Sequence, residues 1–167
     1  MHLILSLLII SVLLPASLRA DFPEVGKAAP GIVIAEWLTG EIQEETPLAG
    51  RTIILEFWAT WCSPCIKAIP HMNALQSVFD EQILFLSITD ESRSKVERFL
   101  QKTRMSSAVV IDNQRKTYTA YGVDAIPETF LIDSAGVVRW HGHPDELTEE
   151  GIREFLENDI APYTWDF

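Results

Sequence analysis

Cysteine is scarce in this sequence, because the 167 residues include only two, Cys62 and Cys65. A structural zinc site needs four ligands, and no second cysteine pair is present to complete one. The histidines left as candidate ligands are His71, His141 and His143. Covalent haem attachment requires a histidine directly after the second cysteine, and Ile66 occupies that position. The sequence therefore excludes a c-type haem and disfavours zinc.

The spacing of the two cysteines also argues against a purely structural role. A bridge between Cys62 and Cys65 would close a very short loop, and the stability that a cross-link adds grows with loop length. An inert disulfide stays open as an alternative at this point. A reversible dithiol, whose thiolate acts as a nucleophile, explains the pair better.

Positive charge is in short supply as well. Lys and Arg number 13 against 24 Asp and Glu, which gives a formal net charge of -11 at pH 7. A chain of this charge repels a phosphate backbone, so no nucleic-acid partner is expected.

Long apolar runs are missing too, apart from a short one at the start of the chain. A membrane-spanning helix needs about 20 apolar residues. The run Leu3–Leu14 is shorter and is followed by Pro15 and several small residues. This pattern predicts a secretory signal peptide over residues 1–20 that is cleaved after export. The alternative is that residues 3–18 are retained as an anchor, the only case in which a membrane contact is expected.

The remainder of the chain has the length of one domain, and it contains no internal repeat or low-complexity segment. We therefore expect residues 21–167 to form a single domain. With a cleaved leader the protein would be exported and soluble, in the periplasm or another extracytoplasmic space.

Strand and helix patterns alternate along this domain. Runs rich in β-branched and aromatic residues indicate strands, and apolar residues at helical spacing indicate helices. Strands are predicted at Ile32–Glu36, Thr52–Trp58, Ile83–Thr89, Ala108–Ile111, Thr129–Ile132 and Val137–Trp140. A helix is predicted to start near Ser63–Pro64, with apolar residues at helical spacing from Ile66 to Phe79, and further helices are predicted at Ser92–Lys102, Lys116–Tyr121 and Thr148–Leu156. Pro70 is expected to kink the first helix, and Thr148 to cap the last. This order predicts an α/β fold: a central mixed, mostly parallel sheet with an antiparallel C-terminal hairpin, flanked by helices.

The two cysteines fall between a buried strand and a helix. The thiolate is the nucleophile in disulfide exchange, and a helix N-terminus lowers the pKa of a cysteine. Cys62 is expected at that terminus with its sulfur exposed, as the attacking residue. Cys65, one turn further on, is expected to be more buried and to resolve the mixed disulfide.

Two segments of the chain carry a family resemblance. Residues 56–65, Glu-Phe-Trp-Ala-Thr-Trp-Cys-Ser-Pro-Cys, resemble the active-site strand and turn of thioredoxins. More narrowly, they resemble the exported thiol-disulfide oxidoreductases of the TlpA/ResA type and the related cytochrome c maturation thioredoxins (DsbE/CcmG). Residues 121–133, Tyr-Gly-Val-Asp-Ala-Ile-Pro-Glu-Thr-Phe-Leu-Ile-Asp, resemble the second signature of that family. Segments 25–30 and 48–51 resemble its lead-in, so the resemblance implies a thioredoxin fold.

The resemblance implies a cis bond between Ile126 and Pro127 that faces the dithiol. Such a bond would leave the Ile126 backbone free to pair with an extended substrate segment. An ordinary turn at Pro127 is the alternative. Glu128 is expected to tune the site or contact a partner, or else to be a plain surface residue. The residues expected to contact substrate are Trp61, Ser63, Pro64, Ile126 and Glu128, with Trp58 also packed around the site.

Glu56 is unusual because it interrupts an otherwise apolar strand. A buried carboxylate is costly and should titrate high unless it is paired. The residue aligns with the buried acid of thioredoxins, which implies a proton relay to Cys65. No lysine is present on Ile83–Thr89 to pair with it. The alternative is that Glu56 points to solvent at the strand end.

The function that the resemblance implies is the reduction of disulfides in exported proteins, including apocytochrome c-type partners. A membrane thiol reductase would supply the electrons. No flavin, nicotinamide or metal is expected, because the two sulfurs carry both electrons. Two alternatives remain: the same fold acting as a disulfide oxidase or isomerase, and a non-catalytic module that binds copper through the two thiols. For His141 and His143, a surface position is expected rather than a metal role.

Overall fold

The computed structural model describes residues 22–40 and 48–157. The predicted signal peptide or anchor lies outside the described residues, as does the C-terminal tail 160–167, to which the sequence assigns no element. Among the described residues, no helix is long and apolar enough to cross a membrane.

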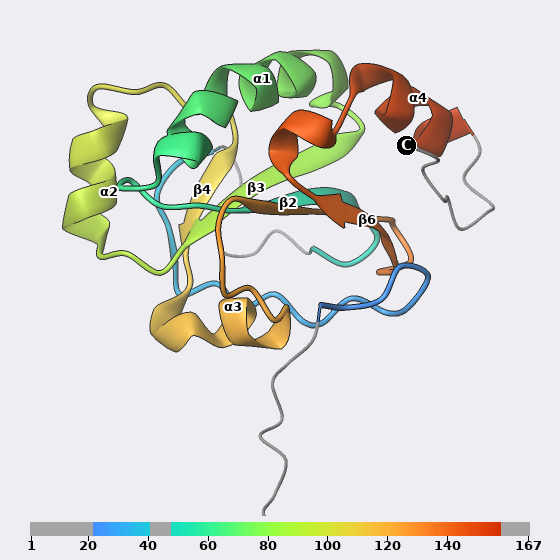
Figure 1. Cartoon of the computed structure of the whole chain (residues 1–167), viewed down its shortest axis with the longest axis horizontal. Coiled ribbons are helices and arrows are strands. Elements are labelled where there is room, and N and C mark those ends of the chain that lie inside the picture. The colour runs from blue at the N-terminus through green and yellow to red at the C-terminus, as the bar shows by residue number, and fades with distance from the viewer. Residues whose placement is uncertain (1–21, 41–47, 158–167) are drawn as a thin grey trace, which may run out of the picture.

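Six strands form one sheet in the order β1-β4-β3-β2-β5-β6 (Figure 1). Their bounds are β1 Glu36–Trp37, β2 Thr52–Phe57, β3 Ile83–Thr89, β4 Ala108–Ile111, β5 Glu128–Ile132 and β6 Val138–Gly142. The strands β2, β3 and β4 are parallel to one another. The hairpin β5–β6 is antiparallel and joins the sheet beside β2, while β1 pairs antiparallel with β4. The sheet is mixed, as predicted, with a larger antiparallel part than the sequence pattern indicates.

Four helices flank this sheet: α1 Ser63–Phe79, α2 Arg93–Leu100, α3 Lys116–Ala120 and α4 Glu149–Glu157. Short 3₁₀ turns, η1 Asn113–Arg115 and η2 Pro144–Glu146, precede α3 and α4. Figure 1 shows α1 and α4 on one face, α3 on the opposite face, and α2 beside the edge near β4. The helix α1 continues through Pro70, and the kink expected there stays a prediction. Thr148 caps α4, because its Oγ1 accepts a hydrogen bond from the Gly151 N–H at 3.1 Å.

Each face of the sheet has its own core, because successive side chains of a strand point to opposite faces. On β2, Ile54 belongs to the cluster that contains Phe79 of α1. Its neighbour Leu55 belongs to the cluster that contains Tyr118 of α3. By this alternation Glu56 lies on the face that α1 covers. The only charged residue of β2 is thus placed under the helix that begins at the cysteines.

The N-terminal arm departs from the predicted pattern. The strand expected at Ile32–Glu36 is wrong in its extent, since only Glu36–Trp37 forms β1. At Val33 the backbone bonds to a side chain, because its N–H donates to Thr117 Oγ1 at 2.9 Å, and bonding to β4 begins at Ala35, whose N–H donates to the Ile111 carbonyl at 2.8 Å. The arm still covers apolar surface, because Ile32 packs against the core on the α3 side. The other helices and strands begin and end within two residues of their predicted bounds.

Candidate active site

The two cysteines lie at the start of α1 and are joined by a disulfide. Cys62 is the N-cap residue, and Cys65 lies in the first turn, with the two Cα atoms 5.3 Å apart. The Cys65 backbone N–H points at Cys62 Sγ, at a distance of 3.2 Å. Pro64 also lies in this turn, where its missing N–H costs no helical hydrogen bond. When the bond is reduced, the free N–H groups and the helix dipole stabilise a thiolate at Cys62.

Both cysteines are buried in the oxidised state. Cys62 is 3% exposed and Cys65 is fully buried, so the order of exposure follows the prediction. The expected exposure of Cys62 itself is wrong for this state. The reason is that Cys62 packs within the cluster that contains Trp58 and Ala59, while Ile126 covers it from outside.

The Ile126–Pro127 peptide bond is cis. It lies in the segment between α3 and β5, and the Ile126 carbonyl oxygen is 3.7 Å from Cys62 Sγ. Ile126 and Pro127 are each partly exposed, so a partner chain can reach both of them next to the sulfur. The structure thereby brings together the two signature segments, 56–65 and 121–133, that the sequence analysis singled out.

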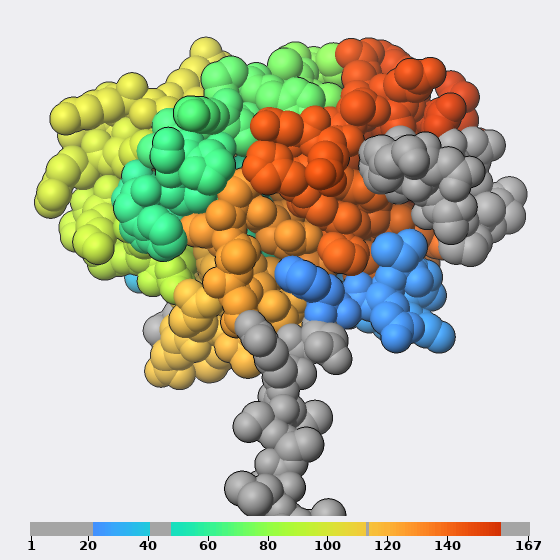
Figure 2. Space-filling view, viewed as in Figure 1, coloured from blue at the N-terminus to red at the C-terminus, as the bar shows by residue number. Residues whose placement is uncertain are grey.

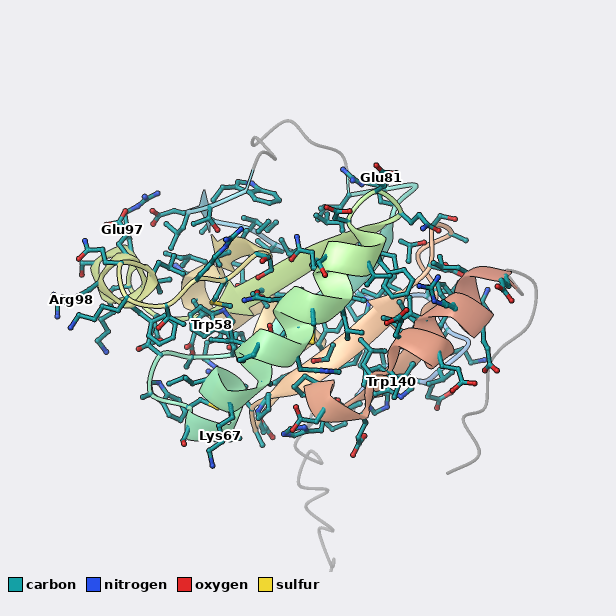
Figure 3. All side chains as sticks on the ribbon, turned by 90° about the horizontal axis from the view of Figure 1, so that it is seen from above. Trp58, Lys67, Glu81, Glu97, Arg98 and Trp140 are labelled. Atoms are coloured by element: carbon teal, nitrogen blue, oxygen red, sulfur yellow. A yellow bond between two sulfur atoms is a disulfide. The ribbon has the colours of Figure 1, made fainter. Side chains whose placement is uncertain are left out.

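The residues expected to surround the dithiol include both exposed and buried side chains. Trp61 is 70% exposed at the turn before Cys62, and Ser63 and Pro64 are exposed beside it. Trp58 is fully buried, with its ring 5.4 Å from that of Phe99 on α2. Trp58 thus packs around the cysteines, as expected, but from the buried side and not at the exposed surface. Figure 3 shows this side chain between α2 and the first turns of α1.

Glu56 is buried, with 2% of its surface exposed, which excludes the alternative that it points to solvent. Its Oε2 accepts a hydrogen bond from Ser87 Oγ at 2.9 Å. Its Oε1 has no hydrogen-bond partner among the described residues. Burial raises the pKa of Glu56 from 4.5 to about 7, and the Ser87 hydrogen bond only partly offsets this. The side chain can therefore gain or lose a proton near neutral pH.

Further buried hydroxyl groups extend from Glu56 across the sheet, and sequence reasoning did not find them. Ser87 Oγ lies 2.7 Å from Ser107 Oγ, just before β4. On the other side, Thr129 is the cross-strand neighbour of Glu56, and its buried Oγ1 has no partner among the described residues. A small cavity of about 10 Å³ borders Glu56, Ser87 and Ser107. These four residues form a polar row beneath α1.

Glu91 is a second buried carboxylate that the sequence analysis missed. It follows β3 and accepts two hydrogen bonds from one residue of the active-site turn, Thr60. The Thr60 backbone N–H donates to Oε2 at 2.6 Å, and the Thr60 hydroxyl donates to Oε1 at 2.9 Å. Glu91 therefore holds the turn that leads into Cys62. No sequence signal marked it, because it stands in a charged segment before a surface helix.

Glu128 has a partner that the sequence did not indicate. Its Oε1 lies 3.0 Å from His141 Nδ1, across the β5–β6 hairpin. The His141 ring packs against the rings of Phe130, at 5.4 Å, and Phe22, at 5.2 Å, and these two rings also lie 6.1 Å from each other. His141 is thus a partly buried partner of Glu128, where a surface position was expected. Within 22–40 and 48–157, no three His, Cys, Asp or Glu side chains are grouped to hold a metal ion.

A Cys-x-x-Cys disulfide at the start of a helix that covers a buried acid, with a cis-proline beside the sulfur, defines the site of a thioredoxin-fold dithiol oxidoreductase. Residues 25–141 match the model of the AhpC/TSA family, and the chain belongs to this family. It is 36% identical over 137 residues to the thiol-disulfide oxidoreductase ResA of Geobacillus thermodenitrificans (strain NG80-2). That match covers 80% of this chain and 77% of the relative. The chain is accordingly a thiol-disulfide oxidoreductase of the ResA type.

Solved structures show the same fold. A protein from Chlorobium tepidum, described as thiol:disulfide interchange protein DsbE, is 26% identical with a TM-score of 0.57, over 65% of this chain and 79% of that one. StoA from Bacillus subtilis is 23% identical with a TM-score of 0.56, over 66% of this chain and 85% of that one. The predicted thioredoxin fold is confirmed.

Proposed function

We propose that this protein reduces disulfide bonds of exported proteins outside the cytoplasm, through the dithiol Cys62/Cys65. The observation that carries the proposal is the position of Cys62 Sγ, 3.7 Å from the Ile126 carbonyl and bordered by exposed residues. A partner chain bound at this carbonyl meets Cys62 first, while Cys65 stays covered. This asymmetry supports the proposal that Cys62 attacks the substrate and Cys65 resolves the mixed disulfide.

The first step forms a mixed disulfide. The Cys62 thiolate attacks one sulfur of the substrate disulfide, the Cys62–substrate bond forms, and the other substrate sulfur leaves as a thiolate that takes a proton from water. Ile126 and cis-Pro127 hold the substrate segment in an extended form beside the sulfur. Trp61, Ser63 and Pro64 supply the exposed surface around it, and Glu128 stands next in the chain.

The second step releases the product. Cys65 loses its proton, its sulfur attacks Cys62 Sγ, and the second substrate sulfur leaves as a thiolate that takes a proton from water. The Cys62–Cys65 disulfide is then restored, and two electrons have passed to the substrate. The two sulfurs carry both electrons, so no organic cofactor or metal is needed.

Glu56 is proposed as the group that accepts the Cys65 proton. A base is most effective when its pKa lies near the working pH, and burial raises the pKa of Glu56 to about 7. Its place under α1, with Oε1 unpartnered among the described residues, leaves the carboxylate able to take that proton.

The catalytic cycle needs an electron donor, and the protein must be exported to reach its substrates. We propose that a membrane thiol reductase reduces the Cys62–Cys65 disulfide, as the family resemblance implies. Residues 1–20 would direct export and be removed, leaving 21–167 as the working domain, or residues 3–18 would anchor it. Apocytochrome c-type chains are among the substrates to be tested.

A trapping experiment with residues 21–167 tests the assignment. The reduced Cys65→Ala variant should accumulate a mixed disulfide with a disulfide-bonded substrate such as insulin, whereas Cys62→Ala should not. The wild-type protein should reduce insulin when dithiothreitol is supplied. Tight one-to-one Cu(I) binding without disulfide exchange would contradict the proposal, and so would trapping on Cys65.

A further inference from the structure

The positive charges of this acidic chain are concentrated in one segment. Residues 93–104 contain five of the 13 basic residues and one of the 24 acidic residues. The basic members are Arg93, Lys95, Arg98, Lys102 and Arg104. The rest of the chain therefore has 23 acidic and 8 basic residues. This segment is α2 with the loop that follows it.

The segment lies directly against the active-site turn. A shallow groove of about 290 Å³ is lined by Thr60, Lys95, Arg98, Phe99 and Lys102, which we call the cationic groove. Thr60 precedes Cys62 by two residues, so one wall of the groove belongs to the turn that carries the dithiol. In Figure 2 the surface of α2 adjoins that of this turn, and Figure 3 shows Arg98 on the outer side of α2.

The charges of the cationic groove are available to a ligand. Arg98 and Lys102 are exposed and form no ion pair with any of the described residues. Lys95 is 64% exposed at its side chain and lies 4.0 Å from Glu91, whose two oxygens already accept hydrogen bonds from Thr60. By contrast, Arg93 outside the groove is neutralised by Glu36, at 2.6 Å, and by Glu97.

We propose that the cationic groove binds an acidic segment of the protein substrate, close in sequence to the disulfide that Cys62 attacks. The proposal rests on the reductase function and adds a preference among its substrates. A polypeptide held at Ile126 and Cys62 spans about 3.3 Å per residue, so residues a few positions from its cysteine reach the groove. Arg98 and Lys102 can each pair with a carboxylate there, and the guanidinium does so through two parallel hydrogen bonds.

An acidic peptide fits this surface better than an anionic membrane. The groove is concave and has the volume of a few side chains, whereas a bilayer presents a broad face. The remaining 23 acidic and 8 basic residues would also repel an anionic lipid surface. On a peptide the same excess of negative charge acts differently, since the segment 93–104 beside the groove carries five of the 13 basic residues and thereby orients the substrate toward Cys62.

The test compares peptides that differ only in charge. Each peptide contains one disulfide, and the four residues beside one cysteine are Glu in the first peptide and Gln in the second. The rate constant for oxidation of the reduced wild-type protein is measured for both, at low and at high salt. We expect the Glu peptide to react about tenfold faster at low salt, because opposite charges raise association rates by that order or more. The ratio should approach one near 1 M salt, where screening is nearly complete.

Charge reversals locate the effect. In Arg98→Glu/Lys102→Glu the Glu/Gln rate ratio should fall to one or below, while Lys27→Glu/Lys116→Glu, with the same change in net charge outside the groove, should keep the wild-type ratio. Each variant is judged by the ratio of its rate constants for the Glu and Gln peptides. A general loss of activity lowers both rate constants alike and leaves this ratio unchanged. Lys95 is left in place because it lies beside Glu91.

The outcomes separate the two proposals. If the wild-type protein reduces neither peptide, the reductase function is wrong. If it reduces both at the same rate, or if both double variants lose the preference alike, the cationic groove proposal is wrong and the reductase function stands. Binding to anionic vesicles that depends on Arg98 and Lys102, without a peptide preference, would assign the groove to lipid and would also overturn the proposal.

Discussion

Glu56 and Glu91 are both buried carboxylates near the dithiol, yet their surroundings differ. Glu91 accepts hydrogen bonds on both oxygens, from the N–H and the hydroxyl of Thr60. Glu56 accepts one, from Ser87, and its other oxygen has no partner in the described part of the chain. A carboxylate with satisfied oxygens is suited to hold a turn, and one that is desolvated and incompletely bonded is suited to exchange a proton. The comparison indicates that Glu91 holds the active-site turn in position and that Glu56 exchanges a proton.

The largest expected effect is a slowing of the second reaction step when Glu56 can no longer accept a proton. Glu56→Gln keeps the shape of the side chain and removes its capacity to accept a proton, so the attack of Cys65 on the mixed disulfide should slow by about 10²–10⁴-fold. The attack of Cys62 on the substrate should change little. Rapid-mixing kinetics with acid quenching, which resolves the mixed disulfide from the products, measures both steps. Equal slowing of the two steps would contradict the assignment.

The same substitution, which slows catalysis, should stabilise the folded protein above neutral pH. The pKa of Glu56 is about 7 in the fold against an ordinary value of 4.5, so the folded protein holds an extra proton between these values. Its free energy of unfolding should therefore fall as the pH rises from 4.5 to 7 and then level off, by roughly 3 kcal/mol at most. Urea unfolding of oxidised Glu56→Gln should lack this fall, which leaves the variant more stable than the wild type at pH 8 and similar at pH 4.

Glu91→Ala should destabilise the protein at both pH 8 and pH 4. It removes both acceptors of the partly buried Thr60 N–H and hydroxyl, which costs about 1–3 kcal/mol. Urea unfolding measures the loss. Glu97→Ala is the matched control, since this exposed residue makes an i,i+4 pair with Arg93 that is worth no more than about 0.5 kcal/mol. Equal effects of the two substitutions would show that Glu91 does not hold the turn.

The smallest effect concerns the Ser87 hydroxyl. Its hydrogen bond lowers the pKa of Glu56 against the effect of burial. Ser87→Ala should therefore raise that pKa further, by less than about one unit, since such a bond contributes roughly 1 kcal/mol. The pH profile of mixed-disulfide resolution should shift upward without loss of its plateau, and a profile that stays in place would mean that Ser87 does not contact the relay.

The contrast between the two acids also shows what a sequence can indicate. Glu56 could be found because a charge inside an apolar strand is a local anomaly, and Cys62, Cys65 and Pro127 because they stand in compact motifs. Glu91 and Ser107 could not, because their partners lie 31 and 20 positions away in the chain and no local pattern records such a hydrogen bond. The same holds for His141, whose partner Glu128 is reached only across the β5–β6 hairpin.

The observed strands and helices match the sequence predictions where their side chains are well buried. The arm around Ile32 did not, because Ile32 is partly buried against the core while the backbone of the exposed Val33 bonds to Thr117 on α3. An apolar run thus predicts burial more reliably than it predicts pairing in a sheet. Exposure of Cys62 was overestimated for a related reason, since the covering residue Ile126 comes from a distant segment.

The reduction potential of the Cys62–Cys65 pair tests the central claim most directly. It is measured on residues 21–167 by equilibration with dithiothreitol or glutathione buffers at pH 7, with the free thiols counted after acid quenching. A reductase of exported proteins should have a value near that of thioredoxin, about -270 mV. A value near that of a strong oxidant, about -120 mV, would mean that the protein forms disulfides and would contradict the account.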